Sequence, residues 1–290
     1  MLRQIFKSFV SSSQKPLIKK NELFLGLNEE TKKADTINLD ESNNFIYAGG
    51  LGSGKTLSLQ YSLVNWLKFN MDQSMVFLIN SRREMNEYAF LWQKLSNNKR
   101  LEQIHRVSPN VSAVSSLIEL LSQELELRVE RFEKTKNSPE TKDPEFTKIM
   151  TIIEDFDLLC KDLALDQWSP GSVPAKLARL LRVGRAYGIH FLVATTDLEQ
   201  VPIKILVLFG HILTFKGLNN EIVKSRLEHQ SYHQINNPNQ YIDNFGRIRT
   251  FPDFNWEVAT EELLNNYQDL KKNFAFDGFI RCLALDQYLY

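Results

Sequence analysis

The sequence predicts an α/β fold in which a mostly parallel core sheet of five strands is flanked by helices. Runs of consecutive apolar residues are typical of strands that are buried on both faces. These runs alternate with longer amphipathic segments, which is typical of a parallel sheet. The predicted strands are Phe45–Ala48, Met75–Ile79, Ile149–Ile153, Phe191–Thr195 and His211–Phe215.

The amphipathic segments predict the helices. In Leu57–Phe69, apolar residues recur on one helical face, as expected for a helix that packs on a sheet. The other predicted helices are Val111 to about Lys134, Ala175–Tyr187 and Thr260 to about Lys271.

Three regions are expected along the chain. Residues 1–21 contain a serine-rich stretch with several lysines and are expected to form a linker. Residues 22–229 form the core, which opens with a lead-in hairpin of Glu22–Leu27 and Thr36–Leu39. Residues 230–290 are asparagine-rich and less regular, and we expect them to pack on the core as a C-terminal extension.

Composition and local sequence patterns argue against several classes of protein. The chain has 290 residues, with 35 basic and 35 acidic side chains. No overall positive charge therefore attracts nucleic acid. Cys160 and Cys282 lie far apart without neighbouring metal ligands, so reduced thiols in a cytosolic protein are expected. The N-terminus lacks the pattern of a signal peptide, and the longest apolar stretch, Val201–Phe215, is interrupted by Lys204 and is too short to cross a bilayer.

A phosphate-binding motif connects the first predicted strand to the first predicted helix. The pattern G-x-x-x-x-G-K-[ST] is matched by Gly49, Gly50, Leu51, Gly52, Ser53, Gly54, Lys55 and Thr56. Such a loop turns backbone N–H groups onto phosphate oxygens at a helix N-terminus. Lys55 would place its charge on the β and γ phosphates, and the Thr56 hydroxyl would bind Mg²⁺. A chance glycine-rich turn is the alternative, and the order strand, loop, helix argues against it.

A second stretch resembles one family of P-loop proteins. Leu177–Thr195, with Arg185-Ala186 followed by Gly188-Ile189-His190 and ending in Ala194-Thr195, is similar to the region after the Walker B strand of the FtsK/SpoIIIE-type ATPases. His211–Arg226 resembles the segment that follows. The likeness extends over roughly residues 24–228 and implies a RecA-like P-loop fold that binds ATP and Mg²⁺.

Within that family, Leu25–Thr31 resembles the lead-in of the ATPase modules of type VII (ESX) secretion motors, most of all the C-terminal, third module. This resemblance implies a cytoplasmic domain of a larger cell-membrane protein. Its partners would be neighbouring ATPase domains of the same polypeptide and secreted helical-hairpin proteins, with a ring oligomer in the full-length protein. Strong nucleic-acid binding is not expected.

The chain departs from the family pattern at the catalytic carboxylates. The family has Asp-Glu after the third strand, whereas this chain has Glu154-Asp155. The resemblance implies that Glu154 acts with Thr56 on the metal and that Asp155 acts as the base. Asp155 is one methylene shorter than the usual Glu, and a misplacement of about 1 Å can cost about 10²-fold in rate. Thr196 also replaces a Gln. We therefore expect ATP binding with weak or no hydrolysis.

Other interpretations remain open from the sequence. Glu154 and Asp155 could be ordinary carboxylates at a strand end. Arg185 is the candidate arginine finger that reaches a neighbour's phosphate, although this helix face could equally be solvated. His190 is expected to pack at the start of its strand. The rival functions are a DNA translocase of the FtsK or conjugation type and a binding module that uses no nucleotide.

Overall fold

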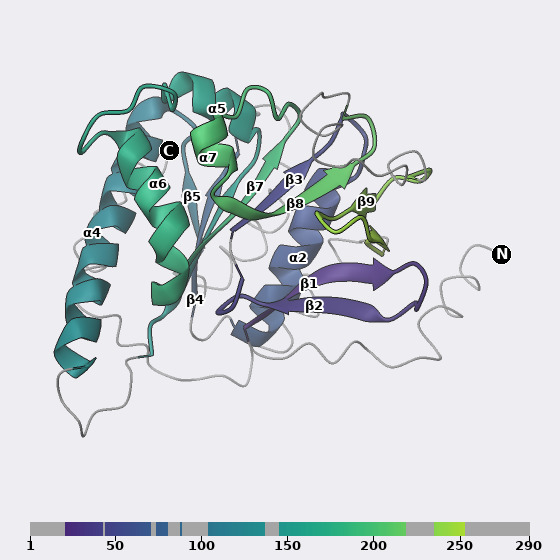
Figure 1. The fold of residues 1–290 in the computed structure, drawn as a ribbon, viewed down its shortest axis with the longest axis horizontal. Coiled ribbons are helices and arrows are strands. Elements are labelled where there is room, and N and C mark those ends of the chain that lie inside the picture. Colours follow the sequence, from purple (N-terminus) through teal and green to yellow (C-terminus); the bar gives the residue numbers. More distant parts are fainter. Residues whose placement is uncertain are drawn as a thin grey trace.

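The computed structural model describes residues 21–42, 44–70, 74–80, 88, 104–136, 145–218 and 235–252. These residues form three layers, with a central sheet between one helix on one face and a group of helices on the other (Figure 1). The sheet has ten strands in the order β2-β1-β10-β9-β8-β3-β7-β6-β4-β5.

The block from β8 to β5 is parallel and contains all five predicted strands. Its members are β3 (Asn44–Ala48), β4 (Ser74–Ile79), β5 (Ile104–Val107), β6 (Lys148–Ile153), β7 (Ile189–Thr195) and β8 (Phe209–Phe215). The predicted fold class is confirmed, and the structure adds β5 at the edge of the block.

The antiparallel part of the sheet brings together segments from both ends of the described chain. It consists of β1 (Glu22–Asn28), β2 (Ala34–Asn38), β9 (Gln240–Ile242) and β10 (Ile248–Thr250). The predicted lead-in hairpin is confirmed as β1 paired with β2. Strand β10 pairs with β1 and strand β9 pairs with β8, so residues 240–250 join the hairpin to the parallel block.

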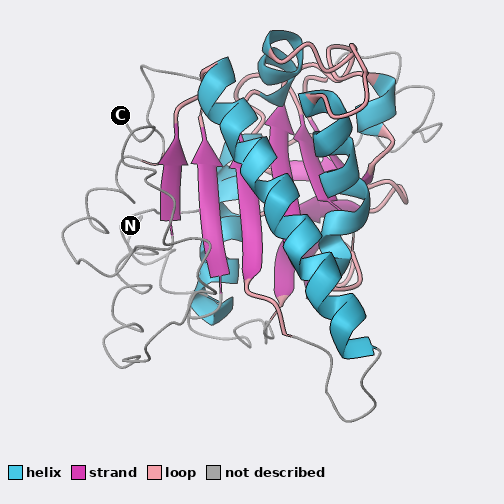
Figure 2. Cartoon of the chain, turned by 90° about the vertical axis from the view of Figure 1, so that its left-hand side faces the viewer, coloured by secondary structure: helices cyan, strands magenta, loops and turns pink. Residues whose placement is uncertain are grey.

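The helices cover both faces of the sheet. They are α2 (Lys55–Asn70), α4 (Val111–Lys136), α5 (Phe156–Asp162), α6 (Val173–Val183) and α7 (Ile203–Leu206), with a 3-10 helix η2 (Gly184–Tyr187) after α6. Figure 2 shows the long helix α4 and its neighbour α6 lying across one face, while α2 lies behind the sheet. Gly188 ends η2 with a φ of 75°, the left-handed conformation in which glycine commonly ends a helix.

Two hydrophobic clusters hold the layers together, and alternate residues of β3 belong to different clusters. Ile46 joins α4, α5 and α6 in the first cluster. Tyr47 joins Leu63 and Trp66 of α2 in the second. This alternation follows from the period of two along a strand, and it fixes the motif strand between both helical layers.

Some predictions lie outside the described residues. These are the linker 1–20, the helix Thr260–Lys271, Cys282, and residues 219–234 and 253–290 with the predicted boundary at 229/230. Within the described parts, no helix is long and apolar enough to span a membrane.

Candidate functional site

Three loops meet at the carboxyl edge of the parallel strands. They follow β3, β6 and β7. The last residue of β3, Ala48, pairs with the last residue of β7, Thr195, and the last residue of β6, Ile153, pairs with Val193 of β7. Gly49, directly after β3, donates its N–H to the Thr195 carbonyl O at the end of β7, at 3.1 Å. Glu154, directly after β6, donates its N–H to the Ile79 carbonyl O at the end of β4, at 2.9 Å. In open parallel sheets, ligands bind at this edge.

The glycine-rich loop has the backbone conformation that its sequence requires. Gly52 and Gly54 have φ values of 70° and 87°, a region that residues with a Cβ rarely adopt. Neither residue's N–H has an acceptor among the described residues. The loop therefore offers backbone donors at the start of α2, where the helix dipole also favours an anion.

Lys55 is the first residue of α2 and folds back over the loop. Its side chain is buried, and Nζ donates to the Gly50 carbonyl O at 3.5 Å. This distance is at the limit of a hydrogen bond. The ammonium group therefore lies at the loop, where a bound phosphate group would accept a charge-assisted hydrogen bond from it.

Glu154 connects the two halves of the site. Its Oε2 accepts a hydrogen bond from the Thr56 hydroxyl at 3.1 Å, and its Oε1 accepts one from the Tyr88 hydroxyl at 2.8 Å. Both Glu154 and Tyr88 are buried. The hydroxyl and the carboxylate are hard oxygen donors of the kind that Mg²⁺ prefers, so the predicted metal pair lies together. Tyr88 was not predicted, because no motif connects it to Glu154.

Asp155 occupies a tight turn between β6 and α5. Its φ of 51° and ψ of 50° are left-handed, and its side chain does not cap α5. Its carbonyl O accepts the N–H groups of Leu158 and Leu159, at 3.1 and 3.3 Å. Such a conformation costs energy in a residue other than glycine and often marks a functional position. The predicted base is thus buried beside Glu154.

A further carboxylate, Asp157, lies at the same edge and was missed by the sequence analysis. Its Oδ2 accepts hydrogen bonds from the Thr196 hydroxyl at 2.6 Å and the Thr196 N–H at 3.3 Å. Its Oδ1 is buried without a hydrogen-bond partner in the described part of the chain. Thr196, the residue where the resemblance to the FtsK/SpoIIIE-type ATPases leads us to expect a Gln, is therefore held by α5.

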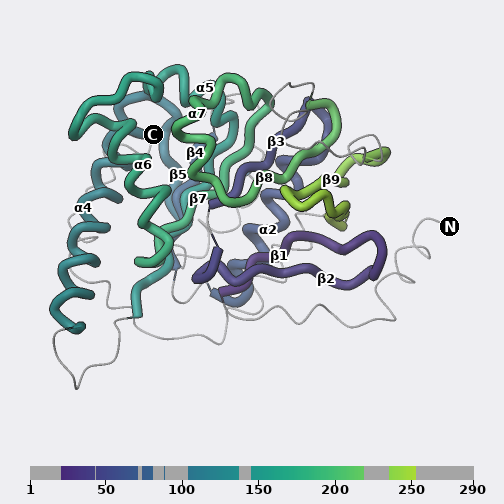
Figure 3. The backbone as a smooth tube through the Cα atoms, in the orientation of Figure 1, coloured from purple at the N-terminus to yellow at the C-terminus, as the bar shows by residue number. Residues whose placement is uncertain are grey.

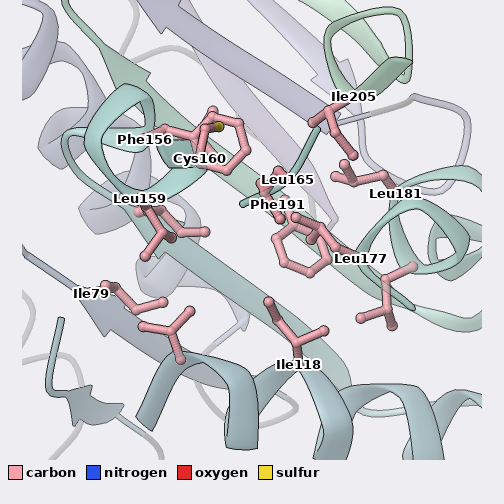
Figure 4. Close-up of a cluster of buried hydrophobic side chains, with 14 of the residues drawn as sticks. Ile79, Ile118, Phe156, Leu159, Cys160, Leu165, Leu177, Leu181, Phe191 and Ile205 are labelled. Carbon is pink, nitrogen blue, oxygen red and sulfur yellow. The ribbon is translucent and has the colours of Figure 1, made fainter. Parts of the chain in front are cut away.

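Helix α5 is anchored in the core behind these carboxylates. Figure 4 shows Phe156, Leu159 and Cys160 of this helix beside Phe191 of β7 and Ile205 of α7. Burial and the nearby Asp157 carboxylate raise the pKa of the Cys160 thiol, so this cysteine is protonated at neutral pH and inert. The structure assigns it to the core, as expected of a buried thiol.

The structure does not bring Arg185 to the site of its own chain. Arg185 precedes β7, at the amino edge of the sheet, and its Nη1 donates to the Glu41 carbonyl O at 2.8 Å. The seven residues of β7 separate it from the glycine-rich loop by roughly 20 Å. The neighbouring Arg179 makes a two-pronged ion pair with Glu126 of α4, and Arg182 is exposed.

His190 packs in the sheet, as predicted. It is 1% exposed, and neither ring nitrogen has a hydrogen-bond partner among the described residues. Burial, reinforced by the charge of Lys148, lowers its pKa to about 3. His190 is therefore neutral at physiological pH.

A three-layer α/β fold with a glycine-rich loop between β3 and α2, and a carboxylate bonded to the Thr of that loop, defines a RecA-like P-loop fold. No group of three or more His, Cys, Asp or Glu that could hold a metal occurs among the described residues. No protein-family model and no curated protein sequence matches the chain.

Solved structures share this fold. The tandem ATPases 2 and 3 of EssC from Geobacillus thermodenitrificans match with a TM-score of 0.67 and 14% identity, over 90% of this chain and 52% of that one. EccC from Thermomonospora curvata, ATPases 2 and 3 in complex with a signal sequence peptide, matches with a TM-score of 0.59 and 15% identity, over 88% and 48%. The pCW3 conjugation coupling protein TcpA, with ATPγS, matches with a TM-score of 0.63 and 14% identity, over 88% and 73%.

The chain spans about half the length of the EssC and EccC structures. The resemblance to FtsK/SpoIIIE-type ATPases of the EssC kind is therefore confirmed at the level of the fold.

Proposed function

We propose that this chain is an ATP-binding module of a type VII secretion motor. The observation that carries the proposal is the hydrogen bond between Thr56 and Glu154, which joins the phosphate loop to the carboxylate after β6. The backbone N–H groups of the loop would hold the phosphates together with Lys55. Thr56 and Glu154 would hold Mg²⁺, which supplies charge neutralisation of the phosphates when bound.

Hydrolysis by this module is slow in our proposal. The Glu154 carboxylate already accepts hydrogen bonds from Thr56 and Tyr88, which suits a metal partner better than a base. Asp155 would then have to act as the base, and its side chain is one methylene shorter than that of a Glu. Thr196, which stands where a Gln is expected, is hydrogen-bonded to Asp157. Phosphate release by the purified chain would then fall well below the ordinary enzyme range of about 1–10³ per second. A turnover of several per second that Lys55→Ala abolishes would contradict slow hydrolysis.

Arg185 is proposed to act as an arginine finger only on the nucleotide of a neighbouring module. Its place at the amino edge of the sheet is too far from the loop of its own chain, whereas an arginine finger acts on a neighbour's phosphate. In a ring of modules, Arg185→Ala would lower the turnover of the assembled motor and leave the ATP affinity of the single module unchanged.

The proposed partners are proteins. The matching EccC structure consists of ATPases 2 and 3 in complex with a signal sequence peptide. For this chain we propose neighbouring ATPase domains of the same polypeptide and secreted helical-hairpin proteins, on the cytoplasmic side of the cell membrane. Residues 230–290 are the proposed recognition region. Their deletion from residue 274 onward should reduce export if the proposal holds, and unchanged export would remove the case for this tail.

The likeness to TcpA, a conjugation coupling protein, favours a DNA translocase as the second candidate. Non-specific DNA binding depends on phosphate neutralisation by Lys and Arg, and this chain has no net positive charge. A mobility-shift titration with duplex DNA at physiological salt separates the two. We expect little binding, and tight, salt-sensitive binding would support the translocase.

A further inference from the structure

Asn239 lies against the glycine-rich loop, although it is distant in sequence. Its backbone N–H donates to the Ser53 carbonyl O at 3.1 Å. Its side-chain Oδ1 lies so close to Gly54 that a Cβ on that glycine would sit 2.0 Å away. The segment that carries Asn239 leads into β9, which lies between β8 and the β1–β2 hairpin (Figure 3). A residue from outside the motif therefore contacts the loop at its tightest point.

The hydrogen bond to Ser53 sets the direction of one donor of the loop. The peptide that joins Ser53 to Gly54 is trans, and in a trans peptide the C=O and the N–H point in opposite directions. Because Asn239 holds the Ser53 carbonyl, the Gly54 N–H is turned to the other side of the loop. That N–H has no acceptor among the described residues, as expected of a donor that faces a phosphate.

Asn239 has a left-handed backbone conformation and a buried side-chain oxygen. Its φ is 66°, a left-handed conformation that Asn tolerates better than most residues. Its carbonyl O accepts the Phe251 N–H at 3.0 Å. Within the part of the chain that the structure describes, its Oδ1 is buried without a hydrogen-bond partner, and so is the hydroxyl of Ser53. Buried polar groups without a partner are uncommon in folded proteins, and a bound ligand or an ordered water is one explanation for them.

The segment around Asn239 is fixed on both sides. On one side, the carbonyl O of Lys216 accepts a hydrogen bond from the Gly50 N–H of the loop, at 3.0 Å. The side chain of the same lysine donates a hydrogen bond from Nζ to the Asn236 carbonyl O, at 3.3 Å. On the other side, Gln240 donates from Nε2 to Glu29 Oε1, at 3.1 Å, in the turn of the lead-in hairpin. The contact between Asn239 and the loop is thus supported by both the parallel block and the hairpin.

We propose that Asn239 is a positioning residue of the nucleotide site, which holds the Ser53–Gly54 peptide so that its N–H faces a nucleotide phosphate. This inference rests on the proposed ATP binding. Asn239 acts through the loop backbone and not as a catalytic residue. The ligand class is a nucleoside triphosphate with Mg²⁺.

Calorimetric titration of the whole chain with Mg-ATP tests the proposal. Asn239→Gly keeps the left-handed backbone and the N–H donor but removes the side chain that packs on Gly54. Without the Asn239 side chain against Gly54, the Ser53–Gly54 peptide can rotate, and its charge-assisted hydrogen bond to the phosphate is weakened or lost. We therefore expect the Kd for ATP to rise about tenfold. Asn239→Asp keeps the shape and adds a negative charge beside the phosphates, so it should weaken binding at least as much. Asn236→Ala is the matched control, because its exposed side chain lies in the same segment.

Thermal unfolding with and without Mg-ATP separates positioning from a purely structural role. Positioning predicts that the rise in Tm caused by ATP shrinks in Asn239→Gly. A purely structural role would lower Tm equally in both conditions, and this result would overturn the inference. The inference would also be overturned if Asn239→Gly bound ATP as tightly as the wild type or more tightly. If the glycine variant does not fold, unchanged affinity in Asn239→Asp would overturn it. Either result would leave the proposed function intact. A wild-type chain without ATP affinity would refute the proposed function, and this inference with it.

Discussion

The Thr56 hydroxyl donates a hydrogen bond to Glu154 Oε2 across 3.1 Å, although 98 residues separate the two in the chain. In P-loop NTPases, an aspartate holds the metal together with the hydroxyl of the phosphate loop. We propose that Glu154, the longer of the two side chains, takes that role here, with the shorter Asp155 in the turn that follows.

The charge of Glu154 should strengthen ATP binding only when Mg²⁺ is present. Glu154→Gln keeps the length and the acceptor for Thr56 but removes the charge. We expect the affinity in Mg²⁺ to fall about tenfold, the value of a charge-assisted contact, with the affinity in EDTA unchanged. Calorimetry under both conditions measures this, with Glu126→Gln in an exposed pair as the control. Equal losses with and without Mg²⁺ would show that Glu154 acts on the fold and not on the metal.

Restoring the family order should accelerate hydrolysis. In the double variant Glu154→Asp, Asp155→Glu, the base gains a methylene, so at least about tenfold of the roughly 10²-fold loss that such a misplacement can cause should be recovered. Glu is less suited than Asp to the left-handed turn, which limits the gain. Phosphate release is the measurement, and Lys55→Ala in the same background is the control. Unchanged turnover with intact ATP binding would show that the carboxylate order is not what limits the rate.

His190 should make the protein less stable in mild acid. Its pKa is about 3 in the folded state, against 6.5 for an ordinary histidine. As pH falls below 6.5, His190 becomes protonated in the unfolded chain but stays neutral in the folded chain. The free energy of unfolding therefore decreases. The loss between pH 7 and pH 5 is about 2 kcal/mol. His190→Leu should remove this loss, as urea unfolding at both pH values would reveal. Parallel pH dependence in the two proteins would exclude the burial of a neutral histidine as the cause.

The sequence predicted the elements whose signal is local. Buried strands such as Ile149–Ile153 are continuous apolar runs, and the phosphate loop is a contiguous motif. Strand β5 was missed because Ile104–Val107 carries His105 and Arg106 at the exposed edge of the sheet. Strands β9 and β10 have only three residues each, too few to show a period.

The contacts of the site likewise fall into those that the sequence predicts and those that it does not. The contact between Thr56 and Glu154 followed from two motifs that the family resemblance connects. The contacts of Tyr88 with Glu154 and of Asp157 with Thr196 could not be predicted, because they depend on which loops meet at the sheet edge. Asn239 reaches Gly54 only because β9 pairs with β8.

Calorimetry of the purified wild-type chain and of Lys55→Ala with Mg-ATP decides whether the glycine-rich loop is a nucleotide site. We expect saturable binding by the wild type and a loss of at least about tenfold in Lys55→Ala, because a point charge directed at the phosphates is removed. The melting temperature without nucleotide should remain similar in the two proteins. A wild-type chain that does not bind ATP, or a Lys55→Ala variant that binds it equally well, would contradict the account.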